Sequence, residues 1–257
     1  MSSKTERATV AGEAGESVAA VVVNYRQEPF LGRLMDSLEG QTLLPSAVVL
    51  VHSRPSSFEA PPGVISITCS ANRGYAAALN RGILRAMEEG ATSFLALNAD
   101  SFLDRRCVEF LASAPGDIVQ PLILLAERPG RINAAGLAPT RLGLAYCMKY
   151  MRREGSAGLA AVPVPAASGA AMLVRRRVFE RVGPLEEGFF MYLEDVEFCL
   201  RARSMGFETF LEPKARVWHH YRWNLSFSKV ASLWRNARIV RNRFTREELT
   251  WRPRSRP

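Results

Sequence analysis

The first hundred residues most constrain the fold, because strand-like and helix-like segments alternate there. Residues 18–25 read VAAVVVNY, a run of β-branched and small apolar side chains that is typical of a strand buried on both faces. The segments that follow are a helix, two strands, a second helix and a fourth strand, expected at residues 30–38, 47–51, 64–69, 76–87 and 94–97. This order predicts an α/β fold with a mixed, mostly parallel sheet flanked by helices.

The rest of the chain has a weaker pattern and no internal repeat. We expect strands at residues 117–125, 170–174 and 208–211, a helix at 192–205, and an Ala-, Gly- and Pro-rich loop at 155–167. A chain of 257 residues that is 47% hydrophobic has the length and apolar content of one large α/β domain. No clear boundary divides residues 17–223, so we expect a single domain there, after a flexible extension at residues 1–16.

The positive charge of the chain is concentrated at its C-terminal end. The formal net charge is +9; residues 214–257 contain 12 Lys and Arg and only two acidic residues, which leaves 22 basic and 23 acidic residues before them. The basic end therefore predicts an anionic partner, which is a set of phosphate groups, a membrane surface or nucleic acid. No nucleic-acid recognition motif accompanies the charge, so we expect no binding to nucleic acid.

Residues 224–244 mix apolar and aromatic side chains with arginine, which is typical of a helix lying in a membrane interface. The alternative is a helix whose apolar side packs on the domain. The chain has no apolar run long enough to span a membrane and no secretory leader pattern, and its four cysteines lack the spacing of a metal site. We therefore expect a cytoplasmic protein with free thiols, in peripheral contact with the inner face of the membrane through residues 224–244.

Polar side chains follow two of the expected strands. Asn24 ends the first strand, and Asn98 and Asp100 end the fourth. The carboxyl ends of parallel strands form the ligand crevice of such sheets, and a carboxylate there is suited to hold Mg²⁺ or Mn²⁺ against a diphosphate. The alternative is a simple strand-ending turn, for which Asn and Asp are also favoured.

The segment ANRGYAAALNRGI, residues 71–83, has a glycine-containing turn just before a helix start. A helix start presents free backbone N–H groups to an anion, and Arg73 adds a positive charge. A plain loop and helix start explain the same residues equally well.

Three acids, Glu194, Asp195 and Glu197, crowd the start of a later helix. Acids at this place also complement the helix dipole without any catalytic role. The apolar and aromatic residues 189–192 that precede them indicate a partly dry cleft, in which a carboxylate becomes a better base. Further on, VWHHYRW contains two adjacent histidines, of which only one can face the crevice; Asp100 is a candidate partner for it.

In this order, the segments resemble the inverting family 2 glycosyltransferases of the GT-A fold, and most closely their rhamnosyltransferase-like branch. The resemblance covers residues 18–244 and rests on VVVNYRQEPFLGRLMDSL, NRGYAAALNRGI, LNAD, SGAAMLVRRRVFERVGPLEEGFFMYLEDVEFCLRARSMGF and VWHH. It implies a nucleotide-sugar half at 17–104, an acceptor half at 105–223 and a basic C-terminal helical segment and tail at 224–257. The implied reaction is metal-dependent, inverting transfer of a sugar, with thymidine diphosphate rhamnose the favoured donor, to a hydroxyl of a glycan or lipid-linked acceptor.

The resemblance also implies roles for individual residues. Asp195 corresponds to the catalytic base, and Glu194 to its acidic neighbour near the acceptor. Asp100 and His219 correspond to ligands of Mg²⁺ or Mn²⁺, and His219 is favoured over His220 because it follows Asp195 by 24 residues. The implied donor-binding residues are Asn24, Asn72, Arg73, Gly74, Asn80, Asn98, Asp100 and Arg235.

The chain departs from the family pattern after its second strand. The family has an acid there that contacts the nucleotide base, followed by an amide, whereas this chain has His52 and Ser53. The departure favours one alternative function, a catalytically silent relative that only binds a nucleotide sugar or a partner protein. The presence of Asp100, Asp195 and His219 favours an active enzyme.

Overall fold

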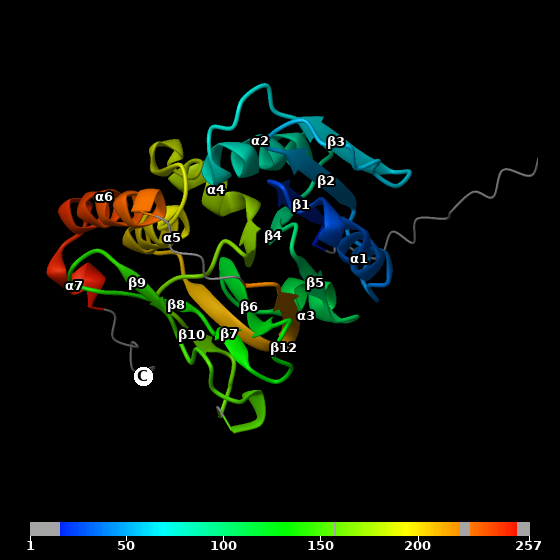
Figure 1. Ribbon diagram of the computed structural model, residues 1–257. Coiled ribbons are helices and arrows are strands. Elements are labelled where there is room, and N and C mark those ends of the chain that lie inside the picture. The colour runs from blue at the N-terminus through cyan, green and yellow to red at the C-terminus, as the bar shows by residue number, and fades with distance from the viewer. Residues whose placement is uncertain (1–15, 157, 222–226, 251–257) are drawn as a thin grey trace, which may run out of the picture.

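The computed structural model describes residues 16–156, 158–221 and 227–250 (Figure 1). The helices of this part are α1 (Glu28–Glu39), α2 (Tyr75–Glu88), α3 (Cys107–Ser113), α4 (Arg176–Val182), α5 (Glu194–Ser204), α6 (Phe227–Arg243) and α7 (Arg246–Leu249). The first six strands are β1 (Val18–Asn24), β2 (Ala47–His52), β3 (Val64–Thr68), β4 (Ser93–Asn98), β5 (Ser101–Leu103) and β6 (Ile118–Leu125). The others are β7 (Ile132–Ala134), β8 (Leu137–Pro139), β9 (Ala145–Cys147), β10 (Val162–Pro163), β11 (Ala171–Arg175) and β12 (Thr209–His219).

One mixed, mostly parallel sheet forms the centre of the domain, as the sequence predicted. Its main path runs β10-β12-β6-β11-β4-β1-β2-β3. Strands β4, β1, β2 and β3 are parallel neighbours, and β12 and β6 form a second parallel pair. Strand β11 joins the two groups and is antiparallel to both β4 and β6. The carboxyl ends of the parallel strands therefore lie along one edge of the sheet, where such folds place their ligands.

The β-branched run of β1 explains why the sheet is covered on both faces. All seven residues of β1 are buried, and alternate residues belong to two different core clusters, because successive side chains of a strand point to opposite faces. One cluster includes buried residues of α1 and α3, and the other includes buried residues of α2, α4 and α5. In α2, a Cβ on Gly82 would overlap side-chain atoms of Val21 and Val51, so glycine lets this helix approach the sheet closely.

The structure confirms the first four strands and two helices to within two residues at each end. It also confirms the strands expected at 117–125 and 170–174, here β6 and β11. The short strand expected at 208–211 was wrong in length, because β12 has 11 residues. The charged and proline-containing sequence EPKA interrupts its apolar pattern, and the pairing with β6 is irregular between Glu212 and Arg216. The loop expected at 155–167 contains the two-residue strand β10.

The helix expected from residue 192 begins two residues later, at Glu194. Tyr192 and Leu193 have φ angles of 73° and 69°, in the left-handed region that a right-handed helix does not allow. The helical spacing of apolar side chains therefore extends two residues before the first residue whose backbone is helical, which is why the predicted helix began too early.

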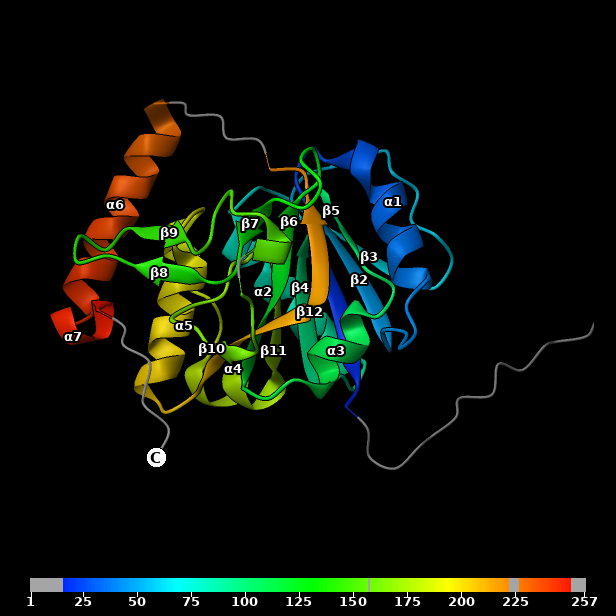
Figure 2. The same cartoon turned by 90° about the horizontal axis from the view of Figure 1, so that it is seen from below.

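Helix α6 lies on the outside of the domain, beside α5 and the β8–β9 hairpin (Figures 1 and 2). A Cβ on Gly143, at the turn of this hairpin, would overlap the carbonyl oxygen of Ala237, so the hairpin packs closely on α6. None of the described helices is long and apolar enough to cross a membrane. Residues 1–15 of the expected extension, 222–223 at the end of the expected domain, and 224–226 and 251–257 of the basic segment lie outside the described residues.

Candidate active site

Strand pairing brings Asp100 and His219 together, although 119 residues separate them in the sequence. Strand β5 follows Asp100 directly and pairs with the end of β12, with Ser101 opposite His219. The backbone N–H of His220 also donates a hydrogen bond to the carbonyl oxygen of Asp100. As a result, Nε2 of His219 lies 3.2 Å from Oδ1 of Asp100.

The hydrogen bonds of His219 fix which of its nitrogens faces Asp100. Nδ1 lies 3.1 Å from Oδ1 of Asn133 in β7, a contact that requires Nδ1 to carry the hydrogen. A neutral ring with this hydrogen has its lone pair on Nε2, the nitrogen that faces Asp100 and lies 3.4 Å from Nδ2 of Asn98. A partner that orients the far ring nitrogen is the usual arrangement of a histidine that binds metal.

His220 points elsewhere, as alternation along a strand requires. Its Nδ1 lies 2.8 Å from Oε1 of Glu127, and its ring packs on Phe30 with the ring centroids 4.5 Å apart. Of the two adjacent histidines, therefore, His219 is the one that faces Asp100.

The Asp100–His219 pair fits a divalent cation that has few protein ligands. The Nε2 lone pair and a carboxylate oxygen face each other, an arrangement that a cation or a proton between them stabilises. No group of three or more His, Cys, Asp or Glu side chains within the described ranges is placed to hold a metal. Two protein ligands leave the remaining positions of Mg²⁺ or Mn²⁺ to water and to phosphate oxygens, which is a common arrangement for such ions.

Glu194 and Asp195 form an acidic pair at the start of α5. Asp195 accepts a backbone hydrogen bond at each oxygen, from Gly169 and from Val196, both at 2.8 Å. Burial raises the pKa of Asp195, and these N–H donors oppose that shift by favouring the charged form. Glu194 is only 6% exposed, and its Oε2 has no hydrogen-bond partner among the described residues.

Burial, followed by the charge of Asp195, raises the pKa of Glu194 to about 8. Glu194 therefore holds its proton at pH 7. Asp195 accepts a backbone hydrogen bond at each oxygen, which favours its charged form, whereas Oε2 of Glu194 has no such donor among the described residues.

Glu194, Asp195 and His219 border the same pocket of about 340 Å³, and Asp100 lies next to it in contact with His219. Its polar lining includes Glu194, Asp195, Asn98 and His219, together with Ser168 and Lys229. Apolar or aromatic side chains such as Leu137, Tyr192 and Leu233 form much of the remaining wall. A largely apolar wall with a few convergent polar groups is typical of a binding site for a small molecule.

A second pocket, of about 270 Å³, lies at the other side of the Gly74–Tyr75 turn, and its lining includes Ser53, Arg73 and Asn80. Gly74 has φ 95°, and a Cβ there would overlap the carbonyl oxygen of Phe190. The N–H of Tyr75 donates to that same oxygen at 2.7 Å. The glycine of this loop is therefore needed for close contact with the segment that leads into α5.

The residues predicted to bind the donor fall into different places. Asn98 borders the first pocket, whereas Arg73, Gly74 and Asn80 border the second. Asn72 lies beside the second pocket and accepts a hydrogen bond from the N–H of Gly74 at 3.0 Å. The amide of Asn80 bonds both the N–H and the carbonyl of Leu185, so this side chain also supports the loop before α5.

Asn24 and Arg235 border neither of these two pockets. Asn24 is buried, and its Nδ2 lies 2.9 Å from Nδ1 of His52. Burial lowers the pKa of His52, so that its ring is neutral at pH 7. Arg235 donates to the carbonyl oxygens of Gly188 and Phe189, at 3.3 and 3.0 Å. Direct donor contacts of Asn24 and Arg235 stay predictions.

The sequence analysis missed three residues that support the site. Tyr75 donates through its hydroxyl to the carbonyl oxygen of Gly169, whose N–H in turn donates to Asp195. Burial and the nearby carboxylates raise the pKa of Tyr75. Asn133 orients His219. Tyr75 and Gly169 stand within quoted motifs, but Asn133 lies in the weakly patterned middle of the chain, where no motif identified it.

Comparisons with known proteins agree with this architecture. The family model described as "Glycosyltransferase like family 2" matches residues 15–242. The hexosyltransferase Agl10 of low-salt glycan biosynthesis in Haloferax volcanii is 54% identical over 41 residues, which are 16% of this chain and 13% of that protein. An N-acetylglucosaminyl-diphospho-decaprenol L-rhamnosyltransferase of Mycobacterium tuberculosis is 43% identical over 58 residues, which are 23% of this chain and 19% of that protein.

The rhamnosyltransferase WbbL of Escherichia coli is 37% identical over 68 residues, 26% of each protein. Among solved structures, GalNAc-T7 with UDP, GalNAc and Mn²⁺ gives a TM-score of 0.63 at 16% identity, covering 83% of this chain and 45% of the other. The mannosyltransferase PcManGT of Pyrobaculum calidifontis, with GDP-Man and Mn²⁺, gives 0.55 at 16% identity, covering 81% and 58%. The matches thus span less than two thirds of each of these proteins, and the structural ones show the shared fold. Because the family model spans nearly all of the described chain, the chain belongs to the family 2 glycosyltransferases and has their GT-A fold.

Proposed function

We propose that this protein transfers a sugar, with inversion, from a nucleoside diphosphate sugar to a hydroxyl group of a glycan or lipid-linked acceptor, with the help of Mg²⁺ or Mn²⁺. The observation that carries the proposal is the single pocket that contains both His219, with Asp100 beside it, and the Glu194–Asp195 pair. The reaction needs a group to stabilise the departing diphosphate and a base to activate the hydroxyl. The two pairs of residues meet these two needs.

Asp100 and His219 would hold the metal, which supplies positive charge to the leaving diphosphate. Asp195 accepts the proton of the acceptor hydroxyl as that oxygen attacks the anomeric carbon. Each of its oxygens receives one backbone N–H and keeps a further lone pair, so its orientation is fixed while it stays able to take a proton. Glu194, which holds its proton at neutral pH, is placed to hydrogen-bond the acceptor without adding a second charge. One base is enough for a single displacement, which inverts the anomeric carbon.

The favoured donor is thymidine diphosphate rhamnose, because two of the relatives are rhamnosyltransferases. Base recognition in this chain has to differ from the family pattern, since the neutral, buried His52 stands in place of an acid. A hydrolysis screen of thymidine, uridine and guanosine diphosphate sugars with Mn²⁺ tests this choice, and the thymidine sugar should react fastest. Preferred hydrolysis of a uridine or guanosine sugar would reject it. Tight donor binding without hydrolysis of any donor would indicate a silent relative instead.

Arg73 is predicted to contact the donor phosphates from the Gly74 loop. Its side chain is 76% exposed and borders the second pocket, and it forms an ion pair with Glu187 at 3.5 Å. Arg73→Ala should raise the Kd of the nucleoside diphosphate by about tenfold, the effect of losing one charge-assisted contact of roughly 1.4 kcal/mol. Arg105→Ala, at an exposed position after β5, is the control in the same calorimetric titration. A Kd equal in both variants would show that Arg73 is a solvated charge.

We also propose that α6 docks the protein on the inner face of the membrane. Its exposed positions Phe227, Ala231, Trp234, Arg238 and Arg241 are spaced four and three residues apart, so they form one stripe. Phe227 is 91% and Trp234 is 54% exposed, and neither arginine of this stripe makes an ion pair within the described part of the chain. The opposite face of α6 packs on the domain through the buried residues Ala237 and Val240. Packing on the domain, the alternative to membrane contact, therefore explains these apolar residues but not the exposed stripe.

Vesicles that contain anionic lipid should therefore sediment the protein at low salt. Each basic residue near such a surface contributes about 1 kcal/mol, so replacing Arg238 and Arg241 by Gln should weaken binding by roughly 30-fold. Arg54→Gln/Arg105→Gln is the matched double variant, because it removes the same charge elsewhere. Wild-type protein that stays in the supernatant at low salt would contradict docking and favour a soluble acceptor.

A further inference from the structure

The segment that leads into the acidic pair has a strained backbone. Phe190, Tyr192 and Leu193 all have positive φ angles, of 61°, 73° and 69°. Bulky residues rarely adopt this region, and such strain persists only where the surroundings hold it in place. Glu194 and Asp195 follow immediately, so the conformation of residues 189–193 sets where α5 begins.

A single buried amide on α6 contacts this segment at three points. Nδ2 of Asn236 lies 2.9 Å from the carbonyl oxygens of Phe189, Met191 and Tyr192. Asn236 is fully buried, whereas most of its neighbours on α6 are exposed or partly exposed. An amide nitrogen has two hydrogens, which are shared here among three carbonyl groups that the strained segment turns toward α6.

Arg235 orients this amide. Its Nε donates to Oδ1 of Asn236 at 3.1 Å, while its Nη2 donates to the carbonyl of Phe189. Because a guanidinium group can only donate, Oδ1 must face Arg235 and Nδ2 must face the segment. The two neighbouring residues therefore act together on the same backbone carbonyls.

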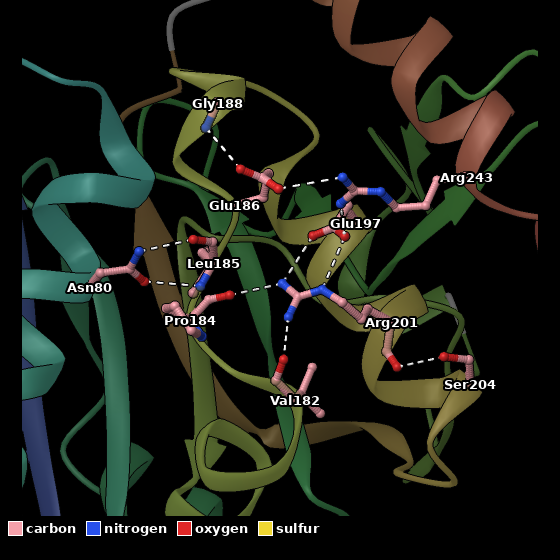
Figure 3. Close-up of polar contacts among 10 residues, drawn as sticks. All are labelled: Asn80, Val182, Pro184, Leu185, Glu186, Gly188, Glu197, Arg201, Ser204 and Arg243. Atoms are coloured by element: carbon pink, nitrogen blue, oxygen red, sulfur yellow. Dashed lines mark hydrogen bonds and ion pairs between the residues drawn. The ribbon is translucent and has the colours of Figure 1, made fainter.

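The other end of α6 is attached to α5 itself. Arg243 donates to the fully buried Glu197 at 2.6 Å and also contacts Glu186 (Figure 3). Arg201 of α5 bonds the same Glu197 and the carbonyl groups of Val182 and Pro184, as Figure 3 shows. Helix α6 is thus held against α5 just after the acidic pair, and Asn236 contacts the backbone just before it.

We propose that Asn236 is a positioning residue of the reaction: by binding the carbonyl groups of residues 189, 191 and 192, it fixes the start of α5 and with it Glu194 and Asp195. This inference rests on the proposed function, in which that pair acts on the acceptor. Asn236 itself borders neither described pocket, so its effect passes through the backbone of the segment. A residue that only packs α6 on the domain would contribute to stability without changing the geometry of the acidic pair.

Asn236→Asp is the sharpest test, because it keeps the size of the side chain and replaces the donor Nδ2 by an acceptor oxygen that faces three carbonyl groups. We expect kcat to fall by roughly 10- to 100-fold, the cost of misplacing a catalytic group by a fraction of an ångström to 1 Å. The KM of the donor should change by less than about twofold, since Asn236 borders neither described pocket. Asn242→Asp, on the exposed side of the same helix, is the control and should behave as wild type.

Arg235→Gln provides a second variant at an exposed position, where loss of folding is not expected. It should lower kcat in the same direction but less, and combining it with Asn236→Asp should cost less than the sum of the two effects. Hydrogen exchange gives a readout that does not depend on activity: the amides of residues 190–197 should exchange faster in Asn236→Asp than in Asn242→Asp.

Equal exchange in the two variants, or a stability loss with unchanged kcat, would overturn the positioning role. Failure of the proposed function would give a different result from failure of the positioning role. If Asn236→Asp leaves kcat unchanged while Asp195→Asn abolishes turnover, the reaction stands and only the role of Asn236 is wrong. The opposite outcome is faster hydrogen exchange in Asn236→Asp combined with a wild-type protein that turns over no donor. That outcome would support the structural role of Asn236 and reject the proposed reaction.

Discussion

Asp195→Asn should lower turnover by about 10²–10⁴-fold, the usual loss when a positioned general base is removed, and should leave donor binding nearly unchanged. Asparagine has no basic oxygen with which to take the acceptor proton. Asp195 accepts hydrogen bonds from the backbone of Gly169 and Val196, and in the proposed reaction it acts on the acceptor, so we expect donor affinity to depend little on its charge. Steady-state kinetics and calorimetry with the nucleoside diphosphate measure the two effects separately.

Asp36→Asn is the matched control, because it makes the same exchange at an exposed position of α1. Glu194→Gln should cost less than Asp195→Asn, since glutamine keeps the hydrogen-bonding ability of a protonated carboxyl group. A larger loss of turnover in Glu194→Gln than in Asp195→Asn would show that Glu194, not Asp195, is the base. Full turnover in Asp195→Asn would exclude it as the base.

The pH profile of kcat follows from the same pair. Burial raises the pKa of Asp195, and the base works only when deprotonated, so kcat should fall as the pH drops through this raised pKa. Glu194, with a pKa of about 8, loses its proton above that pH and then places a second negative charge beside Asp195. A second inflection near pH 8 should therefore appear in wild type and disappear in Glu194→Gln. An identical profile in both proteins would show that Glu194 does not titrate in the working enzyme.

Removal of divalent metal is the second change with a large expected effect. With EDTA, turnover should fall by about 10²-fold or more, because charge stabilisation of the leaving diphosphate by a metal contributes several kcal/mol. Added Mn²⁺ or Mg²⁺ should restore it. Since Asp100 and His219 are only two protein ligands, calorimetry should show tight Mn²⁺ binding only when nucleoside diphosphate is also present.

Variants around His219 separate a metal site from a simple ion pair. His219→Gln and Asp100→Asn should both weaken Mn²⁺ binding in the presence of nucleoside diphosphate. Asn133→Leu, which removes the partner of Nδ1, should weaken it by about 10- to 100-fold, as is usual for residues that orient a ligand. His220→Gln is the control, because His220 binds Glu127. Undiminished activity in EDTA would rule out the metal in this mechanism.

The sequence predicted the parallel part of the sheet because its strands are continuous apolar runs, and the helices between them bury one clear stripe each. It did not predict the length of β12, whose middle carries Pro213 and charged residues at the point where the pairing with β6 is irregular. Nor did it predict the start of α5, because Tyr192 and Leu193 have positive φ angles, in a segment whose backbone carbonyls contact Tyr75 of α2 and Asn236 of α6. Sequence periodicity shows which side chains are apolar. It cannot show the hydrogen bonds to backbone carbonyl groups that surround the start of α5.

The candidate site was likewise predicted only in part from the sequence. The resemblance to family 2 glycosyltransferases identified Asp100, Glu194, Asp195 and His219, which the fold does bring to one place. It also assigned Arg235 to the donor, which stays a prediction; in the structure this side chain donates to the carbonyls of residues 188 and 189. Asn133 and the role of Asn236 were beyond sequence reasoning, because they depend on hydrogen bonds between segments that lie far apart in the chain.

The central claim is that this pocket carries out inverting transfer from a nucleoside diphosphate sugar. Proton NMR of wild-type protein with Mg²⁺ and thymidine diphosphate rhamnose tests it most directly, recorded early enough to see the first-formed free sugar before its anomers equilibrate. The account predicts release of thymidine diphosphate together with a sugar of inverted anomeric configuration, and neither product in Asp195→Asn. A first-formed sugar that retains the donor's configuration, or equal release in Asp195→Asn, would contradict it.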